Sequence, residues 1–306
     1  MGILDALLGR TVAEKRKNLV RVIYATIAFF LAVSVILAFA LAASSEKEDI
    51  DNSTSKKPSD AVTSKTLSFS FADTKTGTLL VVNKNSAAYD FEANPESDLV
   101  LMSSALPSAD GSAIYSLQKD GMLANKEALN ALNEMLKDFY EASSNKDTAK
   151  KLSIRSAYRT YAEQSGYSTP AGQSDFHTGM LFELTLGNTT TSISTDSTFD
   201  WIYENAHKYG FIERYPESKS GETGVSDFDN AFRYVGTPHS TYIKEKNLSL
   251  EGYVELLRES EKPISVSGYK VSYVKASTDG ETEITVSTRN HTVSGDNNGG
   301  FIVTTK

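Results

Sequence analysis

The sequence of 306 residues contains no cysteine, four histidines and one tryptophan. The absence of cysteine excludes disulfides, thiolate zinc sites and a cysteine nucleophile, and it fits an external domain that relies on its hydrophobic core. The chain also lacks an excess of basic residues outside its N-terminal arm. Without the five basic and two acidic residues of the N-terminal arm 1–21, 26 Lys and Arg stand against 37 Asp and Glu, a net charge of −11. Nucleic acid is not an expected partner, since such a surface cannot neutralise phosphates.

One long apolar run stands out in this composition. No charged residue occurs between Arg21 and Glu46, and the segment VIYATIAFFLAVSVILAFALAASS between them is as long as a bilayer-spanning helix needs to be. Basic residues precede it and an acid-rich segment follows, which places the N-terminus in the cytoplasm and the C-terminal part outside. The sequence predicts a single-pass cell-membrane protein with its span in the lipid bilayer at 22–45. A signal peptide cleaved near Ala40-Leu41-Ala42 is the alternative, although this run is longer than most signal-peptide cores.

The rest of the chain divides by composition. Residues 46–66 are polar with almost no large apolar side chains, so we expect a linker. A domain is predicted at 67–258, beginning with an alternating strand pattern from Leu67 to Phe71 and a second apolar run from Leu79 to Val82. Residues 259–306 alternate like strands with Gly, Asp and Asn turns between them, which predicts a small β appendage.

Three helices are predicted by apolar residues at helical spacing. The first begins after Asn125, which can cap its N-terminus. The second contains Trp201 and ends at Gly210, as a C-cap glycine would end it. The third starts at Ser249 and closes before Pro263. Helices and short strands are mixed without a regular strand-helix-strand rhythm, which predicts an α+β fold with an antiparallel sheet and packed helices.

Three further segments carry specific motifs. They read SAYRTYAEQ at 156–164, SDFHTGMLFEL at 174–184, and a third that contains YGFIERYP and ends in FRYVG at 232–236. In this order the motifs resemble those of the VanY-type D-alanyl-D-alanine carboxypeptidases, zinc peptidases of the lysostaphin/D-Ala-D-Ala/hedgehog fold group that trim peptidoglycan stem peptides. The resemblance runs from about Leu79 to Leu257. It implies the fold of that group and a place in a bacterial cell envelope.

The resemblance assigns the zinc ligands and the general base to positions that carry other residues in this chain. In the family, S-x-H-x-x-G-x-A-x-D supplies a histidine and an aspartate ligand, and E-P-W-H supplies the base and the last histidine. In chain order, these positions are occupied here by Phe176, Glu183, Phe228 and Ala231. Phenylalanine and alanine offer no lone pair to a metal, and Phe228 cannot take a proton. We therefore expect no zinc and no carboxypeptidase activity.

His177 leaves an alternative open, an active zinc carboxypeptidase with a rearranged site. It stands next to the family's histidine position, and a local bulge could turn it toward the site of Glu183. Its spacing argues against this, because Phe176 keeps the family's distance to Gly179 and to the acid, and His177 keeps neither. The remaining histidines are expected to be surface or packing residues.

The residues that frame the substrate cleft in the family are retained. Arg159 matches the arginine near the C-terminal carboxylate of the peptide, for which a planar fork of donors is suited. The other matching positions are Tyr158, Gln164, Ser174 and Arg233. The alternative is that Arg159 and Arg233 only form ion pairs that hold the fold.

The sequence thus predicts a membrane-anchored pseudoenzyme with peptidoglycan stem peptides or a cell-wall protein as its partner. A third interpretation is a structural or protein-interaction module that acts through the β appendage.

Overall fold

We analysed a computed structural model of the chain, which describes residues 63–226 and 228–306. The predicted arm, the predicted membrane span and nearly all of the predicted linker lie outside the described residues. Over the described ranges, no helix is long and apolar enough to cross a membrane.

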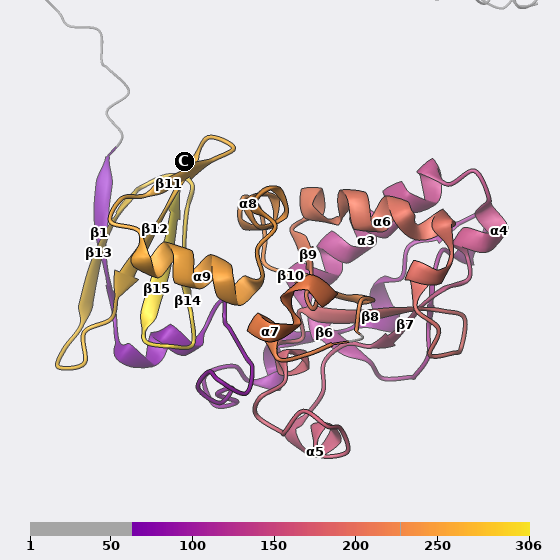
Figure 1. Ribbon diagram of the computed structural model, residues 1–306, viewed down its shortest axis with the longest axis horizontal. Helices are drawn as coiled ribbons and strands as arrows, with labels where there is room; N and C mark the ends of the chain where they lie inside the picture. The colour runs from indigo at the N-terminus through magenta and orange to yellow at the C-terminus, as the bar shows by residue number, and fades with distance from the viewer. Residues whose placement is uncertain (1–62, 227) are drawn as a thin grey trace, which may run out of the picture. The chain divides into compact units, whose positions relative to one another are not determined.

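A five-stranded sheet forms the centre of the region that carries the motifs (Figure 1). Its order is β5 (Ser116–Leu117), β7 (Leu152–Ser156), β8 (Leu181–Leu186), β10 (Ala231–Tyr234) and β9 (Phe211–Glu213). Only the pair of β5 and β7 is parallel, and the other neighbours in this sheet are antiparallel. The expected α+β class with a largely antiparallel sheet is confirmed.

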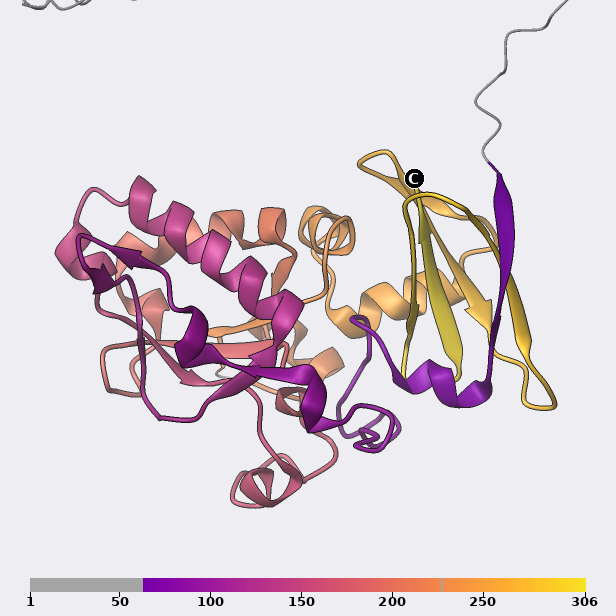
Figure 2. The same ribbon diagram turned by 180° about the vertical axis from the view of Figure 1, so that it is seen from behind.

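Two helices lie side by side over one face of this sheet, α3 (Lys126–Ala142) and α6 (Asp200–Asn205) (Figures 1 and 2). Asn125 caps α3 as predicted, because its side chain accepts hydrogen bonds from two free backbone N–H groups of the first turn, those of Glu127 and Ala128. After α6 a 3-10 turn continues to Gly210, which adopts the left-handed conformation expected of a C-cap glycine, with φ +87°. The apolar stripe of α3 packs into one core with phenylalanines of the sheet, with Phe199 just before α6 and with Ile202 of α6.

The C-terminal strands form a second region of β-structure. A four-stranded antiparallel sheet has the order β11 (Ile264–Val266), β12 (Tyr269–Lys275), β15 (Gly300–Thr305) and β14 (His291–Gly295). The remaining strand, β13 (Thr282–Ser287), pairs with β1 (Ser64–Phe69) from the other end of the described chain. Residues 64–66 therefore belong to a strand and not to the linker, and β1 joins the predicted appendage. Phe69 faces inward in that ribbon, with its ring centroid 5.1 Å from that of Phe301.

The apolar run from Leu79 to Val82 is not a strand. It is apolar because both of its sides are buried. Leu79 and Val81 join the core around α9 (Leu250–Glu259), while Leu80 and Val82 pack with Tyr89 on the other side. The segment therefore runs through the interior without a ladder partner. The predicted start of α9 is confirmed, since the Ser249 hydroxyl accepts a hydrogen bond from the Gly252 N–H.

The remaining elements are short. They are the strand pairs β2 (Leu99–Leu101) with β6 (Leu123–Asn125) and β3 (Ser108–Ala109) with β4 (Ser112–Ala113), and the helices α4 (Lys146–Ala149), α5 (Tyr161–Gln164), α7 (Ser220–Thr223) and α8 (His239–Lys246).

Candidate functional site

The four positions that the resemblance assigns to the zinc ligands and the base lie around the middle of the central sheet. The ladder of β8 and β10 places Glu183 directly opposite Ala231. Phe176 lies in a 3-10 turn, Asp175–Thr178, just before β8, and its ring centroid is 6.1 Å from that of Phe228. Segments far apart in the sequence thus converge on one place.

Three of the four positions form an apolar cluster. Phe176 and Ala231 are buried, and Phe228 packs against them together with Tyr215 and Val225. The rings of Phe228 and Tyr215 are stacked, with centroids 5.6 Å apart and an interplanar angle of 11°. We call these five residues the apolar cluster. It presents hydrocarbon and aromatic faces at positions that the sequence resemblance assigns to the metal ligands and the base.

The fourth position, Glu183, is a buried carboxylate beside two arginines. Its Oε1 accepts a hydrogen bond from Arg155 Nη1 at 2.5 Å. Its Oε2 lies 3.8 Å from Arg159 Nη2 and accepts no hydrogen bond within the part of the chain that the structure describes. Among those residues, no group of three or more His, Asp or Glu side chains is arranged to hold a metal ion.

The Arg159 guanidinium contacts aromatic rings on both of its faces and hydrogen-bond acceptors at two of its nitrogens. Its guanidinium carbon lies 3.7 Å from the ring centroid of Phe176 and 3.8 Å from that of Tyr167. Its Nε donates to Ser156 Oγ at 2.8 Å, and its Nη1 donates to Gln164 Oε1 at 3.2 Å. Burial lowers the pKa of Arg159, but a guanidinium in a protein keeps its charge. Gln164 therefore positions Arg159 from within the protein.

A cavity of about 220 Å³ opens beside these arginines. Arg155, Arg159 and Tyr158 line it, and Tyr167 adds an aromatic wall. The Tyr158 hydroxyl donates to Glu96 Oε1 at 2.9 Å, which fixes the ring at the cavity. We call this cavity the arginine pocket. Guanidinium donors next to an aromatic ring suit a carboxylate attached to a small apolar group.

His177 does not face this pocket. Its Nε2 accepts a hydrogen bond from the Gly172 N–H at 2.9 Å, and its Nδ1 lies 2.7 Å from the carbonyl oxygen of Arg159. Because the first contact needs a lone pair on Nε2, the proton is on Nδ1. Burial lowers the pKa of His177, which favours this neutral form. Ser174, which is also buried, accepts the His177 backbone N–H through its carbonyl at 3.1 Å.

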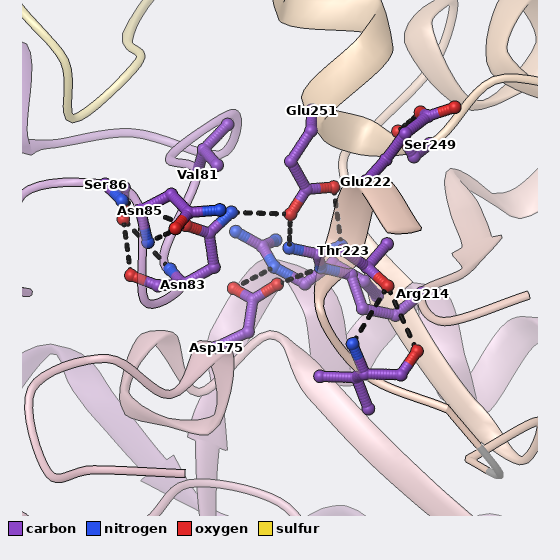
Figure 3. Close-up of polar contacts among 12 residues, drawn as sticks. Val81, Asn83, Asn85, Ser86, Asp175, Arg214, Glu222, Thr223, Ser249 and Glu251 are labelled. Atoms are coloured by element: carbon purple, nitrogen blue, oxygen red, sulfur yellow. Dashed lines mark hydrogen bonds and ion pairs between the residues drawn. The ribbon is translucent and has the colours of Figure 1, made fainter. Parts of the chain in front are cut away.

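A buried ion-pair network lies behind the site (Figure 3). Asp175 pairs with Arg214 Nε at 2.5 Å and with Arg233 Nε at 2.9 Å, and all three side chains are fully buried. The Glu251 carboxylate accepts hydrogen bonds from Arg214 Nη1 and Nη2 at 2.9 and 2.7 Å, and it also accepts one from the Asn83 side chain. Burial by itself raises the pKa of Asp175, but the charges of Arg233 and Arg214 outweigh it and hold the pKa below its usual range.

Arg233 therefore belongs to the interior and not to the cleft. Its Nη1 donates to the carbonyl of Tyr234, and its Nε is committed to Asp175. This corrects the prediction that Arg233 frames a substrate cleft, and the ion-pair alternative describes it. The physical reason is burial, because a guanidinium without exposed surface cannot reach a peptide.

Sequence reasoning missed Arg155, which contacts Glu183 and lines the arginine pocket. The signal was present, since Arg155 is the one charged residue of the strand LSIRS. Its direction was not readable, because the ladder between β7 and β8 shifts register between Ile154 and Ser156. Tyr167 was also missed, because it follows α5 in a turn with no motif of its own.

Comparisons with known proteins agree with the motifs. Residues 165–237 match the family model VanY, D-alanyl-D-alanine carboxypeptidase. A D-alanyl-D-alanine carboxypeptidase of Enterococcus faecium is 34% identical over 240 residues, which cover 74% of this chain and 75% of that protein. Another of that name, from Enterococcus faecalis (strain ATCC 700802 / V583), is 41% identical over 59 residues, 19% of this chain and 22% of that protein.

Among solved structures, the vancomycin-resistance D,D-dipeptidase VanXYg in complex with a D-Ala-D-Ala phosphinate analogue aligns with a TM-score of 0.64. The identity is 25%, and the alignment covers 79% of this chain and 98% of that one. The extent of these matches, together with the shared α+β fold, shows that the chain belongs to the VanY family of D-alanyl-D-alanine carboxypeptidases.

Proposed function

We propose that this protein is a non-hydrolysing member of the family that binds peptidoglycan stem peptides. The observation that carries the proposal is the apolar cluster at the family's catalytic positions. A catalytic zinc needs three lone-pair donors at about 2 Å and an open position for water. Of the four positions only Glu183 has lone pairs, and two guanidiniums face its carboxylate. This donor set does not fit zinc, and Phe228 cannot act as a base.

The contacts of His177 count against an active enzyme with a rearranged site. To reach Glu183 as a ligand, the ring would have to give up its hydrogen bonds to the backbone of Gly172 and Arg159. Both backbone groups would then lose a buried partner, at a cost of about 1–3 kcal/mol each. The ring would also leave its packing against Phe91, whose centroid is 4.8 Å away.

The arginine pocket supports the binding half of the proposal. Arg155 and Arg159 bring two guanidiniums to one cavity, where a peptide's C-terminal carboxylate can accept parallel hydrogen bonds. The open side of Tyr167 offers a surface for the methyl group of a terminal alanine, since this residue is 42% exposed. The solved relative VanXYg is in complex with a D-Ala-D-Ala analogue, which makes the same peptide end the first ligand to test.

The proposed place of action is the outer side of the cell membrane. This part rests on the sequence, where the uncharged run 22–45 follows five basic residues and precedes an acid-rich segment. A single span at that position would hold the peptide-binding domain beside the cell wall.

The test uses the full-length chain in detergent. Zinc content is measured by mass spectrometry, D-alanine release is followed from a stem pentapeptide with added zinc, and binding of the same peptide is measured by calorimetry. We expect no stoichiometric zinc, no D-alanine release and a saturable binding signal. Release of D-alanine that a chelator abolishes would contradict the proposal, and so would a chain that binds no peptide.

Variants locate the binding site. Arg159→Lys keeps the charge but loses the planar fork, so we expect peptide binding to weaken about tenfold or more. Tyr158→Phe, which removes one hydroxyl and leaves the ring, tests the same pocket if the arginine variant folds poorly. The matched control is Arg289→Lys at an exposed position of the β region, which should leave the affinity unchanged.

A further inference from the structure

A second cavity borders the apolar cluster. Its volume is about 360 Å³, and Tyr215 and Val225 of the apolar cluster form part of its wall. Most of the remaining wall carries hydroxyl and amide groups, among them those of Asn83, Thr169 and Gln173. We call it the lysine pocket, because Lys84 is the charged side chain among its described lining residues.

Lys84 is an exposed residue without an acidic partner among the described residues. In the described part of the chain its ammonium forms no ion pair with an Asp or Glu side chain. Its stem passes closely over Gly224, where a Cβ atom would lie 2.8 Å from Lys84 Cε and 3.1 Å from Nζ. Gly224 has φ +70°, so glycine serves both the turn and this close approach. The ammonium therefore stands at the cavity with its charge unmatched.

The arginine pocket and the lysine pocket are linked by a continuous row of rings. The guanidinium of Arg159 covers Phe176 at 3.7 Å, and Phe176 meets Phe228 at 6.1 Å between centroids. Phe228 stacks on Tyr215, which lines the lysine pocket. Phe176 and Tyr215 are buried and only Phe228 is partly exposed, so the rings pack beneath the surface between the two pockets. Tyr167 of the arginine pocket and Ser168 of the lysine pocket are consecutive residues, so one extended peptide can reach both pockets along this loop.

We propose that Lys84 binds a second carboxylate of the same ligand, on a residue upstream of the two D-alanines, so that the protein selects acidic stem peptides. This inference rests on the proposed function. The arginine pocket takes the C-terminal carboxylate, and the ammonium with its neighbouring hydroxyl and amide donors takes the upstream acid. A neutral or basic peptide lacks this last contact.

The test is calorimetry on the full-length chain with two matched probes. One is the pentapeptide L-Ala-γ-D-Glu-L-Lys-D-Ala-D-Ala with a free α-carboxylate on its D-glutamate, and the other carries an amide at that carboxylate. We expect the acidic peptide to bind about fivefold more tightly than the amide, which is typical of one partly exposed ion pair. Lys84→Met should remove this preference and leave the amide's affinity unchanged, while Lys84→Arg should retain the preference.

A third probe separates the two proposals. N-acetyl-D-Ala-D-Ala has no upstream acid, so wild type and Lys84→Met should bind it equally. If the acidic and amidated peptides bind wild type equally, or if Lys84→Met weakens both alike, the lysine pocket is refuted while the arginine pocket stands. If none of the three probes binds, the proposed function itself is refuted. Lys275→Met, at an exposed position of β12, is the matched control and should change no affinity.

Discussion

Replacing Asp175 by asparagine removes the negative charge that Arg214 and Arg233 share in the interior. The three side chains have no exposed surface, so water cannot replace the lost partner. Arg214 keeps Glu251 in two hydrogen bonds of 2.7 and 2.9 Å. The cost therefore falls mainly on Arg233, whose Nε loses its carboxylate at 2.9 Å. Asparagine has nearly the same volume as aspartate, so a cavity does not contribute.

Breaking a buried ion pair by removing one partner costs about 3–5 kcal/mol of unfolding free energy. In a domain of this size, each kcal/mol lowers Tm by about 2–4 °C, so Asp175→Asn should lower Tm by about 6–20 °C. The measurement is thermal and urea unfolding of the full-length chain at pH 7, followed by circular dichroism. The control is Glu255→Gln, because Glu255 pairs with Arg258 at 2.5 Å on the surface with 52% of its side chain exposed.

The control variant should cost less than about 1 kcal/mol, since exposed ion pairs contribute little. The pH dependence adds a second check. The pKa of Asp175 is lowered in the folded protein, so its stabilising effect is present above the unfolded value of about 3.9 and is lost as the pH falls below it. The difference between wild type and variant should therefore shrink below about pH 4. Equal costs for Asp175→Asn and Glu255→Gln at pH 7 would refute the reasoning.

Three further predictions concern stability. Burial lowers the pKa of His239 to about 4, so acidification from about pH 6.5 to 4 should lower the unfolding free energy by up to about 3 kcal/mol. In urea unfolding measured across this pH range, His239→Gln should show a flatter dependence of stability on pH. An unchanged slope would contradict this. Gly210→Ala should lower the unfolding free energy by about 1–3 kcal/mol, measured by thermal unfolding, because φ is +87° and the new Cβ would lie 2.6 Å from the Tyr234 ring. An unchanged stability would argue against that turn geometry. Arg155→Met should lower the unfolding free energy by about 1–2 kcal/mol, measured by chemical denaturation, because Glu183 loses its hydrogen-bond partner at 2.5 Å. Arg155→Lys should recover part of this loss.

The predicted parts of the fold were those that local signals decide. Asn125 starts α3, Gly210 ends the turn after α6, and Ser249 starts α9, because capping depends on groups within a few residues. The pairing of β1 with β13 was not predictable, since alternation shows that a strand exists but not which strand it joins. The conformation of the run from Leu79 was not predictable either, because burial on two sides produces the same composition as a buried strand.

The sequence by itself determined which atoms stand at the positions that the resemblance assigns to the zinc ligands and the base. Phe176, Phe228 and Ala231 carry no lone pair whatever their surroundings, because that property belongs to the side chain alone. Only the tertiary structure decided that Arg159 lines a pocket while Arg233 is buried in a network with Asp175. The sequence alone does not distinguish these two arginines, because their side chains are chemically identical. Their exposure and partners differ because each depends on how segments far apart in the chain pack together.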